Sequence, residues 1–189
     1  GPEGLYLPET YFFSYGDSRR SVLSRMENAM RETLLEAWRS RTNKIAISSP
    51  NEALILASII ERETSEASER ARVSGVFHNR LRKKMRLQSD PTVAYAVTGG
   101  ARRLGRPLNR SDLSIISSYN TYRRRGLPPG PITNPGRAAI FAATRPAVTK
   151  DIYFVADGTG GHLFATTLRQ HNRNVTKWRL IQSRKAKRK

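Results

Sequence analysis

The spacing of apolar residues predicts two helices in the first part of the chain. The first helix follows Asp17 or Ser18 as N-cap, and its apolar residues recur at positions 22, 23, 26, 30, 34 and 38. The second begins at Ser49-Pro50-Asn51-Glu52, where a capping box is combined with a proline in the first turn. Its residues 54–60, LILASII, are apolar or small around most of the helix, which is typical of a helix surrounded by protein.

The rest of the chain alternates helical, strand-like and irregular patterns. A third helix is predicted from about Ser68 to Leu81, and RLQSDP (86–91) indicates a short strand stopped by proline. Residues 118–136, SYNTYRRRGLPPGPITNPG, form the longest irregular stretch, and long loops in compact domains are often functional. A short Ala-rich helix is expected between Pro135 and Pro146, and residues 152–167 have the pattern of a β-hairpin with an Asp-Gly turn.

These elements predict an α+β fold. We expect a helix-rich domain over residues 1–180, with small antiparallel β elements and a long Tyr/Pro/Gly loop over a groove. Residues 181–189 are strongly basic and are expected to form a disordered tail. The 189 residues are enough for one domain with its own core.

Charge is the most unusual feature of the composition. Lys and Arg number 34 against 15 Asp and Glu, so the formal net charge is +19, which favours an anionic partner such as nucleic acid, acidic lipid or a cell-wall polymer. There is no cysteine, which excludes disulfides and thiolate chemistry. No apolar run is long enough for a membrane span. The opening Gly1-Pro2 is typical of a protease scar, so upstream domains are expected to be missing.

Glu61 follows directly after the apolar run of the second helix. At about 100° per residue it lies roughly 20° from Leu54 and 40° from Ala57, so it extends a stripe of small and apolar side chains. Partial desolvation and the negative end of the helix dipole would both raise the pKa of its carboxyl. A carboxyl that is neutral near pH 7 can protonate a leaving oxygen, as glycosidic cleavage requires. The alternative is an ordinary solvated or salt-bridged glutamate.

Other titratable residues give weaker signals. Glu63, Glu66 and Glu69 lie on other sides of the predicted helix and are expected to form a solvated face. The three histidines, His78, His162 and His171, have no metal-binding spacing, so neither a metal nor a cofactor is expected.

Several motifs together resemble one known family. ASIIERET, VFHNRL, MRLQSDPTVAY, SYNTYRRRGLPPGPITNPG and YFVADGTGGHLFATT occur in the order found in the endolytic murein (peptidoglycan) transglycosylase family, MltG or YceG-like. The resemblance extends from EGLYLPETY to about Trp178, nearly the whole chain. It implies non-hydrolytic cleavage of the β-1,4 bond between N-acetylmuramic acid and N-acetylglucosamine, with 1,6-anhydro ends as products.

The resemblance also assigns residues. It implies Glu61 as the catalytic acid and then base, with the sugar's own C6 hydroxyl in place of water. Residues similar to those that line the glycan groove are Gln88, Ser89, Asp90, Tyr119, Asn120, Thr121 and Tyr122. For Asp90 a turn or helix-cap role remains open, and for Tyr119 and Tyr122 core packing remains open.

The family also implies partners and a location. Peptidoglycan strands would be the substrate, and penicillin-binding proteins that polymerise them would be partner proteins. The full-length protein would sit at the periplasmic face of the bacterial inner membrane through a segment outside this sequence. Two alternatives remain at this point: a muramidase that uses water, and a basic nucleic-acid-binding module, for which no recognition motif is present.

Overall fold

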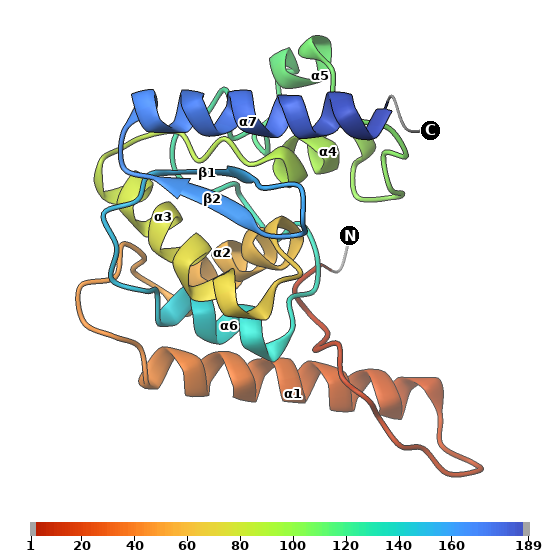
Figure 1. Ribbon diagram of the computed structural model, residues 1–189. Helices are drawn as coiled ribbons and strands as arrows, with labels where there is room; N and C mark the ends of the chain where they lie inside the picture. Colours follow the sequence, from red (N-terminus) through yellow and green to blue (C-terminus); the bar gives the residue numbers. More distant parts are fainter. Residues whose placement is uncertain (1–2, 187–189) are drawn as a thin grey trace.

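Helix α2 (Pro50–Glu63) runs through the centre of the computed structural model, which describes residues 3–186 (Figure 1). The Ser49 side chain caps its N-terminus by accepting from the Glu52 amide at 3.2 Å, as the capping-box pattern predicts. Four helices pack around it: α1 (Arg19–Arg39), α3 (Arg70–Arg82), α4 (Asp90–Thr98) and α6 (Arg137–Thr144).

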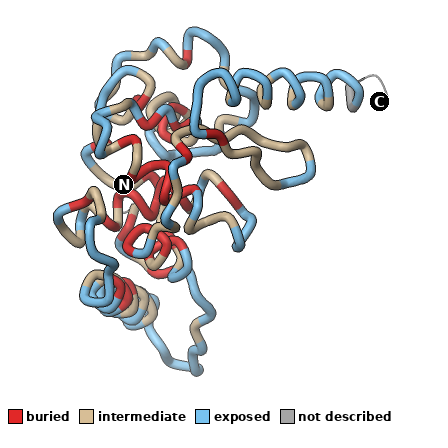
Figure 2. The backbone as a smooth tube through the Cα atoms, turned by 60° about the vertical axis from the view of Figure 1, so that its left-hand side comes forward, coloured by how far each residue is buried: buried red, intermediate tan, exposed pale blue. Residues whose placement is uncertain are grey.

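Burial explains why α2 is central. Leu56, Ile59 and Ile60 are completely inaccessible to solvent, together with their neighbours Ala53 and Ala57. Figure 2 shows the buried segments gathered in the middle of the molecule and α1 exposed along its outer side. A helix that is apolar on nearly all sides is stable only when protein surrounds it, so the helices packed on α2 provide the shared core.

The C-terminal part adds a hairpin and a long helix on top of this core. Strands β1 (Tyr153–Ala156) and β2 (His162–Ala165) pair antiparallel, with Phe154 opposite Phe164. Helix α7 (Leu168–Ala186) lies across this hairpin (Figure 1). The two remaining elements are the 3₁₀ turn η1 (Ala67–Glu69) and the short helix α5 (Arg110–Ser114).

The predicted helices, the hairpin and the α+β class are confirmed, whereas two local predictions are wrong. Residues 86–91 do not form a strand: Ser89 is the N-cap of α4, and Pro91 fits the first helical turn, where no amide donor is needed. Residues 181–186 belong to α7 rather than to a disordered tail. The Gly1-Pro2 opening and residues 187–189 lie outside the described residues. Within those residues, no helix has the length and apolarity needed to cross a bilayer.

Gly75 allows a loop to approach α3 closely. It lies in α3, and a Cβ at this position would come within 2.6 Å of the Ala147 carbonyl oxygen and 2.9 Å of Thr149 Cγ2. The Ala147 amide donates to the Ala71 carbonyl at 2.8 Å, which fixes the loop against this face of the helix. The loop that leads into the hairpin is therefore fixed on α3.

We expect Gly75→Ala to destabilise the protein by about 2 kcal/mol because the added methyl group overlaps backbone. Alanine normally stabilises an exposed helix by about 1 kcal/mol relative to glycine, so the sign is the opposite of the helix-propensity effect. Urea unfolding measures the change in the free energy of unfolding. Ser24→Ala on exposed α1 is the control, which shows the stabilisation that alanine normally gives a helix. A stabilised Gly75→Ala protein would contradict the close approach.

Candidate functional site

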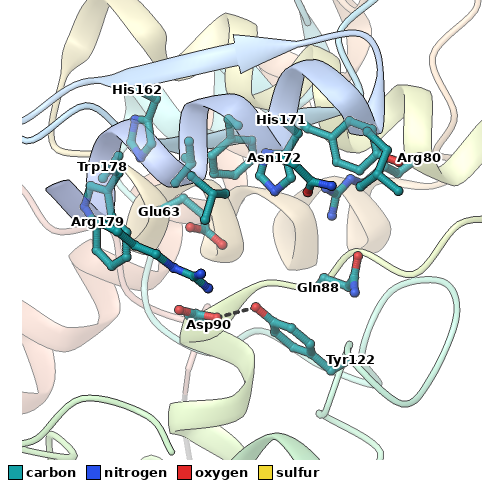
Figure 3. Close-up of a pocket in the computed structure, with 16 residues that line it drawn as sticks. Glu63, Arg80, Gln88, Asp90, Tyr122, His162, His171, Asn172, Trp178 and Arg179 are labelled. Carbon is teal, nitrogen blue, oxygen red and sulfur yellow. Dashed lines mark hydrogen bonds between the residues drawn. The ribbon is translucent and has the colours of Figure 1, made fainter.

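A pocket of about 590 Å³ lies between the end of α2, the start of α4, the hairpin and α7 (Figure 3). Its polar side chains come from separate parts of the chain, from residue 63 to residue 179. The labelled ones are Glu63, Arg80, Gln88, Asp90, Tyr122, His162, His171, Asn172, Trp178 and Arg179. The pocket therefore depends on the tertiary packing of segments between residues 63 and 179.

Glu63 is the acid with the most perturbed titration in this pocket. It is the last residue of α2, and its side chain points into the cavity (Figure 3). Burial raises the pKa of its carboxyl to about 7, and the negative charge of Asp90 adds to the rise. The Ser89 hydroxyl and the charge of Arg80 act in the opposite direction on this pKa, although the Ser89 hydroxyl makes no well-aligned hydrogen bond. Near neutral pH this carboxyl is present in both protonation states.

Asp90 and Tyr122 form a hydrogen-bonded pair on the opposite wall. The Tyr122 hydroxyl donates to Asp90 Oδ1 at 2.5 Å, and this contact is drawn in Figure 3. Burial is the largest cause of a strongly raised Tyr122 pKa, and the Asp90 carboxylate raises it further, so the phenol stays protonated. Asp90 is thereby oriented and also supplies the negative charge that acts on Glu63.

The backbone beside Glu63 is held by a buried arginine. Arg80 donates from Nε to the Ile152 carbonyl at 2.7 Å and from a terminal nitrogen to the Leu87 carbonyl at 2.5 Å. The next residue, Gln88, has a positive φ of 49°, which is strained for a non-glycine residue. Arg80 thus connects the hairpin to the segment that carries Gln88 and Asp90.

Two histidines line the other side of the pocket. His162 is held by Glu69, whose carboxylate accepts from the His162 amide at 2.9 Å and lies 2.7 Å from His162 Nδ1. His171 on α7 stacks on Tyr153 with ring centroids 4.9 Å apart, and its Nδ1 is buried without a hydrogen-bond partner within residues 3–186. Burial, and then the charge of Arg80, lower the pKa of His171, so this ring is neutral at pH 7.

The seven predicted groove residues separate into three groups. Gln88, Asp90 and Tyr122 line the pocket. Ser89 and Thr121 are buried beneath it, where the Ser89 amide donates to Thr121 Oγ1 at 3.0 Å. The remaining two, Asn120 and Tyr119, do not line the pocket.

Asn120 and Tyr119 organise the long loop. The Asn120 amide group donates to the carbonyls of Leu113 and Ile115, at 3.1 and 2.9 Å. The Tyr119 ring packs on Tyr95, with centroids 4.7 Å apart, and Tyr119 is not among the residues that line the pocket. For Tyr119 the structure therefore favours the packing alternative, and for Asn120 a structural role.

Glu61 also lies away from this pocket. Its Oε2 accepts from the Gly136 amide at 3.1 Å, at the N-cap of α6. A carboxylate at a helix N-terminus satisfies a free amide and complements the helix dipole, so this geometry gives Glu61 a structural role. The role of Glu61 as the catalytic acid stays a prediction. Its position, outside the lining of the pocket, does not favour that role.

Sequence reasoning missed Glu63, which was expected on a solvated face; this expectation is wrong. The helical wheel contained the signal: at about 100° per residue, Glu63 lies roughly 20° from Leu56 and 40° from Ile59, two fully buried residues. Glu61 follows the stripe of Leu54, which is only partly buried. His162, His171 and the residues of α7 were missed because their convergence depends on tertiary structure.

Within the described chain, no group of three or more His, Cys, Asp or Glu side chains is arranged to hold a metal ion. The pocket instead combines one carboxyl that can exchange a proton near neutral pH with several hydrogen-bonding side chains and aromatic faces. Such a combination suits acid-base chemistry on a polar, hydroxyl-rich ligand.

The comparisons with known proteins agree in one family. The YceG-like family model matches residues 2–177. The chain is 38% identical over 178 residues to a protein named endolytic murein transglycosylase from Bacillus subtilis (strain 168), covering 93% of this chain and 48% of that protein. It is 33% identical over 179 residues to a protein of the same name from Streptococcus pneumoniae serotype 2 (strain D39), covering 92% of this chain and 31% of that protein.

A solved structure supports the same relationship. The crystal structure of a YceG-like protein from Listeria monocytogenes aligns with a TM-score of 0.74 and 36% sequence identity, over 91% of this chain and 55% of that chain. This chain thus spans about half or less of the length of the curated relatives it matches.

We expect Glu63→Gln to stabilise the protein at alkaline pH. The pKa of Glu63 rises from an ordinary 4.5 to about 7 on folding, so the wild type loses stability as pH rises from about 4.5 to 7. A neutral Gln avoids this loss, and the gain should reach about 2 kcal/mol at pH 8 and vanish near pH 4.5.

Urea unfolding of both proteins at pH 4.5 and pH 8 measures this difference. Glu27→Gln on exposed α1 removes the same charge from a surface position and serves as the control. A gain for Glu63→Gln that is equal at the two pH values would contradict the buried-acid assignment.

Proposed function

Because the chain belongs to the YceG-like family, we propose that it is the catalytic part of a peptidoglycan lytic transglycosylase that cleaves within glycan strands. The names of the two curated relatives support this activity. The observation that carries the proposal is Glu63, a carboxyl with a pKa of about 7 inside a pocket lined by polar and aromatic side chains.

Glu63 would act first as the general acid. In its protonated state it donates a proton to the glycosidic oxygen between N-acetylmuramic acid and the departing N-acetylglucosamine, while the bond from that oxygen to C1 breaks. A carboxyl that is half protonated near pH 7 combines a useful population of the acid with a good driving force for proton transfer.

The same residue would then act as the base. The C6 hydroxyl of the muramoyl ring attacks C1, and its proton moves to the Glu63 carboxylate, which restores the starting state. No water enters the product, so the new end is a 1,6-anhydro ring. A hydrolase of the two-carboxylate type needs a second free carboxylate, whereas Asp90 accepts the Tyr122 hydroxyl and serves here to raise the pKa of Glu63.

The surrounding side chains would position the sugar. Gln88 and Asn172 offer amide groups to hydroxyl and acetamido groups, and His171 contributes a neutral ring to the pocket lining. Trp178 adds an apolar face suited to a sugar ring. The net charge of +19 suits a polymer that bears lactyl and peptide carboxylates.

The alternatives have less support. Nothing in the family assignment favours a nucleic-acid-binding module, and the names of the relatives favour transglycosylation over hydrolysis. Because glycan strands lie outside the cytoplasmic membrane, the proposal implies an extracytoplasmic location. Association with the enzymes that polymerise these strands stays a prediction.

Glu63→Gln should abolish formation of anhydro ends, with at least a thousandfold loss of kcat, because the proton donor and acceptor are removed together. Purified glycan strands are incubated with the protein, and the products are weighed by mass spectrometry. An anhydro end is one water lighter than a hydrolytic end, so the same measurement separates the two reactions.

Glu61→Gln is the matched control, since it makes the same change two residues away on the same helix. Gln retains an oxygen that can accept from the Gly136 amide, so most of the activity should remain. An inactive, folded Glu61→Gln protein beside an active Glu63→Gln protein would return the catalytic role to Glu61.

The pH dependence of kcat/KM should show an alkaline limb that reports Glu63. Above a pKa of about 7 the acid is lost, so kcat/KM should fall by about tenfold per pH unit. Asp90→Asn removes a negative charge that raises this pKa, so the limb should move to lower pH. An alkaline limb that stays in place in Asp90→Asn would argue against electrostatic coupling of the two residues.

A further inference from the structure

A second, smaller pocket of about 270 Å³ adjoins the first one across a shared wall. Glu63 and Asp90 line the first pocket, while their sequence neighbours Arg62 and Pro91 line the second. The end of α2 and the start of α4 therefore contribute residues to both cavities. An extended ligand in the first pocket lies within reach of the second.

The charge of the second pocket is predominantly positive. Arg62, Arg102 and Arg103 line it, and in the described part of the chain none of these three side chains makes a hydrogen bond or ion pair. The acid in the lining is Glu3, which lies beside Tyr95: burial is the largest cause of the raised Tyr95 pKa, and the Glu3 charge adds to it. The lining therefore contains three guanidinium groups and one carboxylate, that of Glu3, which already interacts with Tyr95.

The arginine-bearing loop is built against this pocket. Gly99, Gly100 and Gly105 all have positive φ, at 62°, 78° and 73°, which lets the chain turn back after α4. A Cβ on Gly100 would lie 2.6 Å from both the Tyr95 ring and a Glu3 carboxylate oxygen. The turn is thus packed directly on the pocket wall, and it brings Arg102 and Arg103 to the same cavity as Arg62.

We propose that this second pocket binds a carboxylate carried on a side branch of the glycan strand whose sugars occupy the first pocket. This inference rests on the proposed function. The lactyl group of N-acetylmuramic acid carries a peptide with free carboxylates, and these branches leave the strand next to the bond that is cut. Guanidinium groups recognise carboxylates through two parallel hydrogen bonds, which a sugar hydroxyl cannot match.

Arg102→Gln combined with Arg103→Gln tests the pocket through substrate preference. Two substrates are compared: glycan strands that retain their peptides, and the same strands after enzymatic removal of the peptides. The ratio of kcat/KM for peptide-bearing to peptide-free strands should fall by about tenfold in the double variant, because charge-assisted contacts to the branch are lost. Arg62→Gln should lower the same ratio.

The control is Arg19→Gln combined with Arg20→Gln at the start of α1, which removes two exposed positive charges away from both pockets. Its ratio should equal that of the wild type, which separates a local site from general attraction of the +19 chain for an anionic polymer. Thermal unfolding confirms that each variant is folded.

Three results would overturn the proposal: an unchanged ratio in the Arg102/Arg103 double variant, an equal loss on both substrates, or the same fall in the control. Failure of the proposed function has a different signature, because the wild type would then produce no anhydro ends from either substrate.

Discussion

The desolvation of one carboxyl at the end of a largely buried helix is the constraint on which the rest of the site depends. Glu63 follows Leu56, Ile59 and Ile60 on one side of α2; these three residues have no access to solvent, whereas Glu63 is partly exposed where it lines the pocket. Its ionisation is therefore opposed by desolvation, and the negative end of the helix dipole adds to that cost. The hairpin and α7 complete the enclosure on the opposite side, which explains why a chemically simple site uses residues from so much of the chain.

Two glutamates on one helical turn of α2 face different surroundings. The Glu61 carboxylate accepts an amide hydrogen bond at the start of α6 and stabilises the packing of that helix. Two residues later, Glu63 faces the pocket, where titration near neutral pH is useful. The two residues are of the same type and lie two positions apart, so the direction of each side chain decides which carboxylate faces the amide of Gly136 and which faces the pocket.

The sequence was informative wherever a local pattern determines structure. The Ser18 and Ser49 caps and the hairpin were predicted because capping and turn residues act over a few positions. The segment before Pro91 was misjudged because an extended run and a helix N-cap share the same residues. The choice between Glu61 and Glu63 could not be settled locally, since each borders an apolar stripe and only tertiary packing decides which stripe is fully enclosed.

Arg80 shows how a buried positive charge can coexist with an acid of raised pKa. Its Nε and one terminal nitrogen donate to the carbonyls of Ile152 and Leu87, and its charge lowers the pKa of Glu63 less than burial raises it. A bidentate ion pair between an arginine and the Glu63 carboxylate would stabilise the charged form and lower its pKa below the neutral range. At physiological pH the protonated form of Glu63 would then be almost absent. Because Arg80 donates to the backbone, it fixes the segment that carries Gln88 while the pKa of Glu63 stays raised to about 7.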